Sequence, residues 1–324
     1  MNLASSGREA RRESDPTPLD MLIPDRLNVA LVVIVVVAAI LLLWLGSWVR
    51  EWYAIGAVAI VFSYLLLTNY ALLHEATHLN LHSNPKVNCW LGVVTGLLFP
   101  VPFSMVHVTH QGHHLRNRTD FEMFDLYYPT DNLLLKYGQW YAILCGLFWP
   151  VIPLGGLLFA ACPPVLRTRA FRQARSSSYL LGDIRGAEVR AIRGEVLLIV
   201  TFFAALFWLL HLQWLNTLVL YACFSFNWST RQYIGHAFSR RSVIDGAWNL
   251  RHNSLMTWIL LHGEWDLNHH RRPDVSWYYL PLLALPGEPR PGYVKQYWRQ
   301  WLGPRPATEP APETLGQLPL SVHE

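Results

Sequence analysis

Histidines in three short stretches are the residues of this chain best suited to do chemistry. The stretches are His74-Glu-Ala-Thr-His78, His107-Val-Thr-His110-Gln-Gly-His113-His114 and Asp266-Leu-Asn-His269-His270. Residues four apart on a helix lie on one face, so His74 and His78 can direct two imidazoles at one object. The same holds for His110 with His113 and His114. Imidazole suits zinc, copper, iron and nickel, so the spacing indicates metal binding.

The number of histidines predicts how many ions are held. Eight of them form the candidate ligand set: His74, His78, His110, His113, His114, His236, His269 and His270. One structural zinc needs four ligands, so eight nitrogens suit two ions with positions left open. His82 and His107 lie one turn outside the matched pairs, and with His262 they are candidates for a ligand or an orienting role.

Two other interpretations of the histidines use the same residues. His74, Glu75 and His78 satisfy HExxH, in which two histidines bind zinc and the glutamate is the general base of a metalloprotease. That interpretation leaves the other clusters unexplained, and with two ions Glu75 would instead orient an imidazole. A metal transporter or sensor would line a path through the membrane, whereas these histidines lie outside the apolar stretches.

The composition is that of a membrane protein. The chain is 52% hydrophobic and 15% charged, against about 25% charged in a soluble domain. Its fifteen tryptophans are typical of membrane interfaces. The net charge of +4, without a basic and aromatic groove, gives no reason to expect nucleic-acid binding. The four cysteines have no CxxC spacing, so we interpret them as reduced packing residues.

Apolar runs predict the helices that position the histidines. A span needs roughly 20 residues, and four full spans are predicted at about 27–48, 52–73, 196–212 and 214–227. Prolines and glycines break residues 90–105 and 137–162, which are predicted to be interfacial or re-entrant. The predicted fold is an all-α integral membrane protein with four transmembrane helices, interfacial pieces and a cytosolic helical cap that carries the histidines.

The ends of the chain and one loop complete this organisation. Residues 1–24 are predicted to be disordered or loosely ordered, 25–301 to form a single membrane domain, and 302–324 to be a proline-rich disordered tail. The loop at 167–193 is rich in arginine, which favours the cytosolic side. We therefore expect the histidines to converge at one cytosolic mouth.

The order of the three stretches resembles the membrane fatty acid desaturase family, the histidine-box non-haem di-iron oxidases that also include acyl hydroxylases and carotenoid ketolases. The likeness covers roughly residues 27–285: HxxxH, HxxHH, then a final pair followed by Pro273. Gln232 and His236 resemble the family's extra histidine with a polar residue four positions earlier. The chain departs from the family at Asp266, where the third box usually begins with His or Gln. A carboxylate there could bind iron directly, bind through water, or orient a ligand.

The resemblance implies an O2-dependent oxidoreductase with two iron ions, in which no residue beyond the metal centre is catalytic. It implies desaturation of a lipid acyl chain; the alternative is a hydroxylase or ketolase of the same family. No His-Pro-Gly-Gly, CxxC or nucleotide-binding glycine loop is found in the sequence. A separate electron donor is therefore implied: a ferredoxin, a rubredoxin or a cytochrome b5-type protein. The expected location is a bacterial inner membrane or its equivalent.

Overall fold

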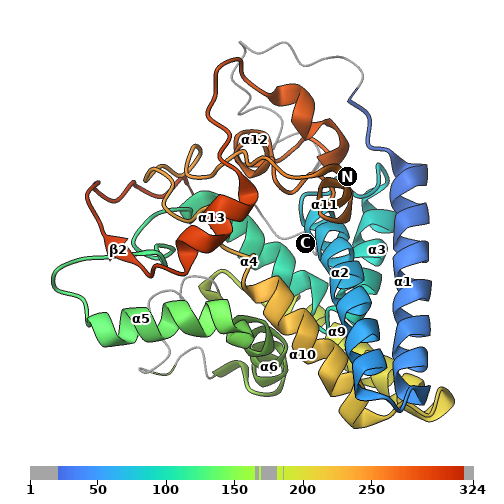
Figure 1. Cartoon of the computed structure of the whole chain (residues 1–324). Coiled ribbons are helices and arrows are strands. Elements are labelled where there is room, and N and C mark those ends of the chain that lie inside the picture. The colour runs from blue at the N-terminus through green and yellow to red at the C-terminus, as the bar shows by residue number, and fades with distance from the viewer. Residues whose placement is uncertain (1–20, 165–167, 169–180, 185, 317–324) are drawn as a thin grey trace.

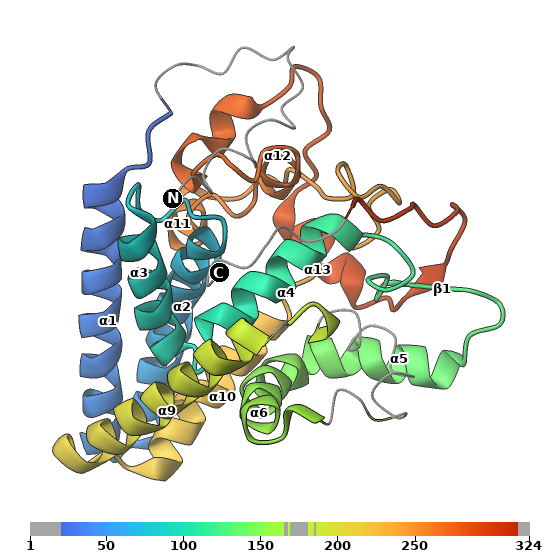
Figure 2. The same cartoon turned by 180° about the vertical axis from the view of Figure 1, so that it is seen from behind.

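The computed structural model describes residues 21–164, 168, 181–184 and 186–316. This part of the chain is mostly helical (Figures 1 and 2). Its elements are α1 (Asp25–Trp48), α2 (Trp52–Thr77), α3 (Pro85–Leu98), α4 (Phe103–Arg116), β1 (Leu126–Tyr127), α5 (Leu133–Ala142), η1 (Ile143–Leu147), α6 (Phe148–Ala161), α9 (Gly186–Leu209), α10 (Trp214–Ser229), α11 (Ser254–Ile259), α12 (Asp266–Arg271), η3 (Trp277–Leu283), α13 (Tyr293–Gln300) and β2 (Arg305–Pro306).

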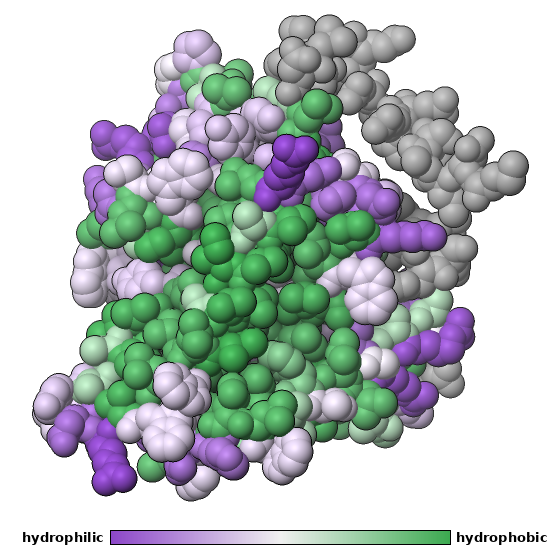
Figure 3. Space-filling view, turned by 90° about the vertical axis from the view of Figure 1, so that its right-hand side faces the viewer, coloured by the Kyte–Doolittle hydropathy of each residue, from purple (hydrophilic) through white to green (hydrophobic). Residues whose placement is uncertain are grey.

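Among the described residues, four helices are long and apolar enough to cross a membrane: α1, α2, the run Leu133–Ala161 and α9. This confirms the predicted number, although the set differs. At 16 residues α10 is about 24 Å long, short of a hydrocarbon core of about 30 Å. The run Leu133–Ala161, predicted to be interfacial, qualifies by length and composition, with a break at Gly146 where φ is 96°. Figure 3 shows a broad apolar band between polar ends, as expected of a multi-pass integral membrane protein.

Helices α3 and α4 form a bent pair, which confirms the irregular segment predicted at 90–105. Their axes differ by 102° across a short break that contains Pro100 and Pro102. No side chain of its own caps α4. The Glu195 carboxylate of α9 instead accepts hydrogen bonds from the Ser104 amide and hydroxyl, at 2.9 and 2.6 Å. Because carboxylates stabilise helix N-termini, α9 fixes where the histidine-bearing α4 begins.

The turns of the α1–α2 and α9–α10 hairpins meet at one end of the molecule. The Gln213 amide donates to Ser47 Oγ at 3.0 Å, and the Asn216 amide donates to the Gly46 carbonyl at 2.8 Å. Trp48, Trp52 and Trp214 are exposed beside these turns, where an aromatic belt would meet the membrane surface. The C-terminal end of α2, with its histidines, therefore lies at the opposite end.

A polar cap built from residues 230–316 covers that opposite end (Figure 1). Asn28 of α1 joins it to the spans, because its amide donates to the Leu81 carbonyl and its oxygen accepts from Trp277 Nε1. The described residues of the predicted tail, 302–316, form part of the cap, and the Arg305 amide donates to the Asp125 carbonyl. Residues 1–20 and 317–324 lie outside the described part, so the division into domains remains a prediction.

Candidate metal centre

The end of α2 and one face of α4 supply the first converging imidazoles. His74 and His78 lie one turn apart, with ring centroids 5.1 Å from each other. Helix α4 packs against α2, and His110 Nε2 lies 2.8 Å from His78 Nε2. His110 therefore shares one cluster with His74 and His78, although it lies more than thirty residues further along the chain.

Helix α12 and the segment after α10 bring in the remaining histidines. His74, His78, His110 and His269 offer nitrogens that all lie within 4.8 Å of one another, and we call them the four-histidine group. His113, His236 and His270 do the same and form the three-histidine group.

His114 lies between the two groups. Its Nε2 is 3.2 Å from His110 Nε2 and 3.1 Å from His269 Nε2, both in the four-histidine group. Its ring centroid is also 4.4 Å from that of His270, in the three-histidine group. All eight histidines predicted as ligands therefore lie together, in two clusters joined by His114.

The donor set fits metal ions. Imidazole nitrogens bind zinc-sized ions at about 2.0–2.1 Å, so two nitrogens on one ion lie about 3 Å apart. The observed Nε2 separations of 2.8–3.2 Å match this value. Burial and the neighbouring imidazoles hold the pKa of His269 and His270 well below the ordinary histidine value. Both rings are therefore neutral at neutral pH, which is the form that binds metal.

Two predicted carboxylates flank the clusters in different ways. Asp266 Oδ2 lies 3.3 Å from His236 Nε2, and its Oδ1 lies 4.0 Å from His270 Nε2. Glu75 is buried, with Oε1 3.8 Å from His74 Nδ1, while its Oε2 accepts a hydrogen bond from the Trp277 amide. Glu75 thus ties η3 to α2, a structural role that differs from that of a protease general base.

The other candidates stay outside both groups. Gln232 accepts a hydrogen bond from the Tyr70 hydroxyl at 3.1 Å. His82 accepts one from the Asn84 amide and lies near the start of α1. The His262 ring stacks on Trp277. The His107 ring lies against Phe103, with centroids 5.9 Å apart. None of the three histidines His82, His107 and His262 joins either group among the described residues.

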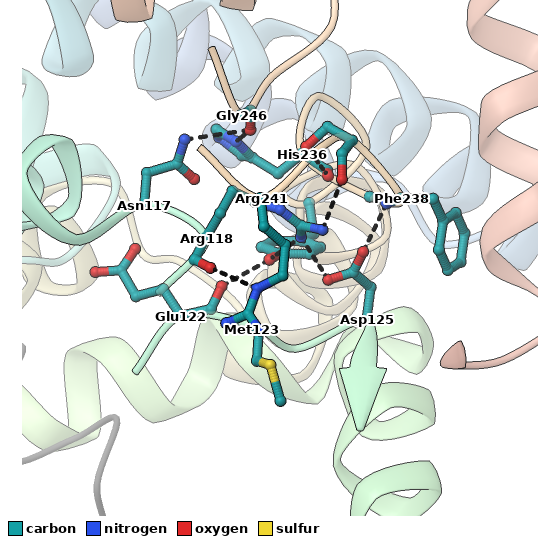
Figure 4. Close-up of polar contacts among 12 residues, drawn as sticks. Asn117, Arg118, Glu122, Met123, Asp125, His236, Phe238, Arg241 and Gly246 are labelled. Carbon is teal, nitrogen blue, oxygen red and sulfur yellow. Dashed lines mark hydrogen bonds and ion pairs between the residues drawn. The ribbon is translucent and has the colours of Figure 1, made fainter. Parts of the chain in front are cut away.

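Sequence reasoning assigned no role to the polar loop after α4, which orients two histidines; Figure 4 shows the contacts of His236 with this region. The buried Glu122 carboxylate bonds His113 Nδ1. His236 Nδ1 donates to the Gly246 carbonyl at 3.0 Å, and the Asn117 amide donates to the same oxygen at 3.2 Å. A Cβ on Gly246 would overlap the Ser242 carbonyl oxygen and the Arg118 side chain, so this close approach needs glycine. Glu122 lies nine residues after His113, a spacing that does not place two residues on one helix face. Only its closeness in sequence to the second histidine stretch could have indicated its role.

A comparison with protein-family models matches residues 47–301, most of the chain, to the family described as fatty acid desaturase. The matched range contains all eight clustered histidines. A search of curated proteins finds no match.

Proposed function

The chain belongs to the fatty acid desaturase family, and from this premise we propose that it is an O2-dependent membrane enzyme that introduces a double bond into a lipid acyl chain. The family makes it an oxidoreductase. The double bond, the acyl substrate and the iron are the proposal. It is supported above all by the arrangement of eight histidines as two groups joined by His114.

In this proposal the four-histidine group holds one iron ion and the three-histidine group holds the other, with His114 between them. Bound iron would supply, together with O2, the oxidising power to remove hydrogen from an unactivated C–H bond, which no side chain can do alone. The chain's own part is to keep the imidazoles neutral and oriented. Helices α2, α4 and α12 do this because rigid elements position ligands better than loops.

Electron balance requires a further partner. Reducing O2 to two waters consumes four electrons and four protons. Forming one C=C bond releases only two of each from the substrate, so two electrons must come from a donor and two protons from solvent. We assign the electrons to a separate ferredoxin, rubredoxin or cytochrome b5-type protein, because the sequence holds no redox motif of its own.

We place the centre on the cytosolic side of the membrane. Arg116, at the end of α4, pairs with Asp183 at 2.8 Å. Asp183 belongs to the arginine-rich loop at 167–193, which is otherwise mostly outside the described residues. Asp183 and the histidines therefore share one end of the molecule, and the excess of arginine in the sequence around Asp183 favours the cytosol for that end.

Aromatic rings lie next to His74 on the membrane side of the centre. The Tyr70 ring lies 6.4 Å from that of His74, and it also contacts Phe99 and Trp228, at 5.3 and 5.1 Å between centroids. This apolar floor would exclude water from one side of the four-histidine group. It supports an apolar substrate such as an acyl chain that approaches from the membrane.

Lipid analysis of a host that expresses the chain tests the proposal, with the variant His269→Ala as the control that lacks a predicted ligand. We expect a new acyl double bond with the wild-type chain and none with the variant. A new hydroxyl group would instead indicate a hydroxylase. Unchanged lipids, in a host that supplies a working electron donor, would contradict the proposal. One zinc per purified chain would revive the protease interpretation.

A further inference from the structure

We propose that the two metal positions are unequal, and that the carboxylates of Glu122 and Asp266 make the three-histidine group the tighter one. The inference rests on the proposed function, because it takes both groups to hold an iron ion. It adds roles for two residues of this chain: Glu122 as a positioning residue, and Asp266 as a fourth ligand that completes the three-histidine group.

Glu122 acts on His113. Its buried carboxylate accepts a hydrogen bond from Nδ1, which leaves Nε2 with the lone pair for the ion. A carboxylate in this position fixes the tautomer and makes the imidazole a stronger donor. Glu122 is itself held, since its main-chain carbonyl accepts from the Tyr233 hydroxyl at 2.7 Å, and Arg118 donates to that hydroxyl at 2.9 Å.

Asp266 reaches the same group from α12. Its two oxygens lie 3.3 Å from His236 Nε2 and 4.0 Å from His270 Nε2. Gly235 makes this possible, because a Cβ there would overlap the Asp266 carboxylate. The missing side chain at Gly235 thus lets the Asp266 carboxylate approach the imidazole nitrogens of His236 and His270.

His236 is oriented as well. Its Nδ1 donates to the Gly246 carbonyl, which Asn117 holds from the other side. Of the three imidazoles in this group, only His270 has an Nδ1 that is buried without a hydrogen-bond partner among the described residues. Preorganisation of the three-histidine group therefore rests on His113 and His236.

The imidazoles of the four-histidine group have less support from carboxylates and hydrogen bonds. Glu75 is the acidic side chain paired with it, and its nearer oxygen is 3.8 Å from His74 Nδ1, beyond hydrogen-bonding distance. The other Glu75 oxygen accepts a hydrogen bond from the Trp277 amide. The Nδ1 of His269 is buried and has no partner in the described part of the chain. An ion in this group would keep most of its double positive charge uncompensated.

Iron binding by the detergent-solubilised apoprotein tests the inference without any measurement of turnover. Fe2+ is titrated anaerobically against a chelator of known affinity, and bound iron is counted. We expect two ions in two resolved steps. Glu122→Gln and Asp266→Asn should each weaken the tighter step by about 10–100-fold and leave the weaker step unchanged. Asp274→Asn is the matched control, since Asp274 pairs with Arg272 outside both groups.

The outcomes separate this inference from the function on which it rests. Two equal steps in the wild-type chain, or variants that weaken both steps alike, would overturn the inequality and leave the proposed di-iron enzyme standing. Fewer than two ions in the wild-type chain would overturn the proposed function itself. Size-exclusion profiles check folding. If Glu122→Gln does not fold, Asp266→Asn decides alone, because the Asp266 side chain is 21% exposed and tolerates an isosteric change.

Discussion

Replacing Arg118 with methionine should destabilise the cap and release iron, although Arg118 touches no predicted ligand. The side chain is fully buried, and its guanidinium donates to Asp125 at 2.6 Å, to the Tyr233 hydroxyl at 2.9 Å and to the Ser239 carbonyl at 3.0 Å. Asp125 also accepts from the Phe238 amide. The pair therefore joins the loop after α4 to the segment that carries His236 (Figure 4).

The magnitude follows from what the substitution leaves behind. Arg118→Met strands the Asp125 carboxylate in a site from which water is excluded. Removing one partner of a buried ion pair costs about 3–5 kcal/mol, whereas replacing both partners with apolar groups is often close to neutral. The double variant Arg118→Met with Asp125→Leu orphans the Ser239 carbonyl and the Phe238 amide, at about 1–3 kcal/mol each. The double variant should therefore lose less free energy of unfolding than the two single variants lose together.

Unfolding of the purified protein in mixed micelles, followed by circular dichroism during an SDS titration, measures these free energies. Iron content is measured on the same samples. A single variant within about 0.5 kcal/mol of wild type, the range of ordinary surface changes, would refute the argument. So would a double variant whose loss equals the sum of the single losses, since the two side chains would then be uncoupled.

Two further substitutions test the centre directly. His113→Ala should lower bound iron and abolish lipid oxidation, whereas His82→Ala, outside both groups, should change neither. Metal analysis of the purified variants and lipid profiling of the expressing hosts provide the comparison. Equal effects of the two variants would contradict the assignment of His113 as a ligand. Gly235→Ala should displace the Asp266 carboxylate and weaken one iron-binding step, whereas Gly155→Ala, where an added Cβ meets open space, should bind iron like wild type; normal iron binding by both would show that the approach of Asp266 is unimportant.

Much of the fold was predictable because it depends on local composition. The spans at 27–48 and 52–73 are unbroken apolar runs, and both appear as helices. The set of four spans was less predictable, because α10 is apolar but short and packs against α2, while the run Leu133–Ala161 is long and apolar enough to qualify although it breaks at Gly146. Hydropathy shows that a segment suits an apolar environment. It does not distinguish lipid from neighbouring helices, because both provide such an environment.

Some residues near the centre could likewise be found from the sequence, and others could not. Seven of the eight histidines chosen from the sequence lie in the two groups, and His114 lies between them. Their motifs could be found because spacing along one helix is visible in the sequence. Glu122 and Gly246 could not be found, since loops bring them to His113 and His236. His82, His107 and His262 were weighed as candidates only because they lie close to the motifs in the chain, and the structure brings none of them into a group.

The sequence by itself determined which imidazoles share a helix face, since the geometry of one helix needs no partner. Only the tertiary structure decided which of them share a group. His110 and His113, in one five-residue motif, belong to different groups, whereas His110 and His269, from distant segments, belong to the same one. The reason is that three residues of an α-helix turn by about 300°, which leaves His113 about 60° from His110 around the axis. The packing of α2, α12 and the segment around His236 then determines which imidazoles each ring meets.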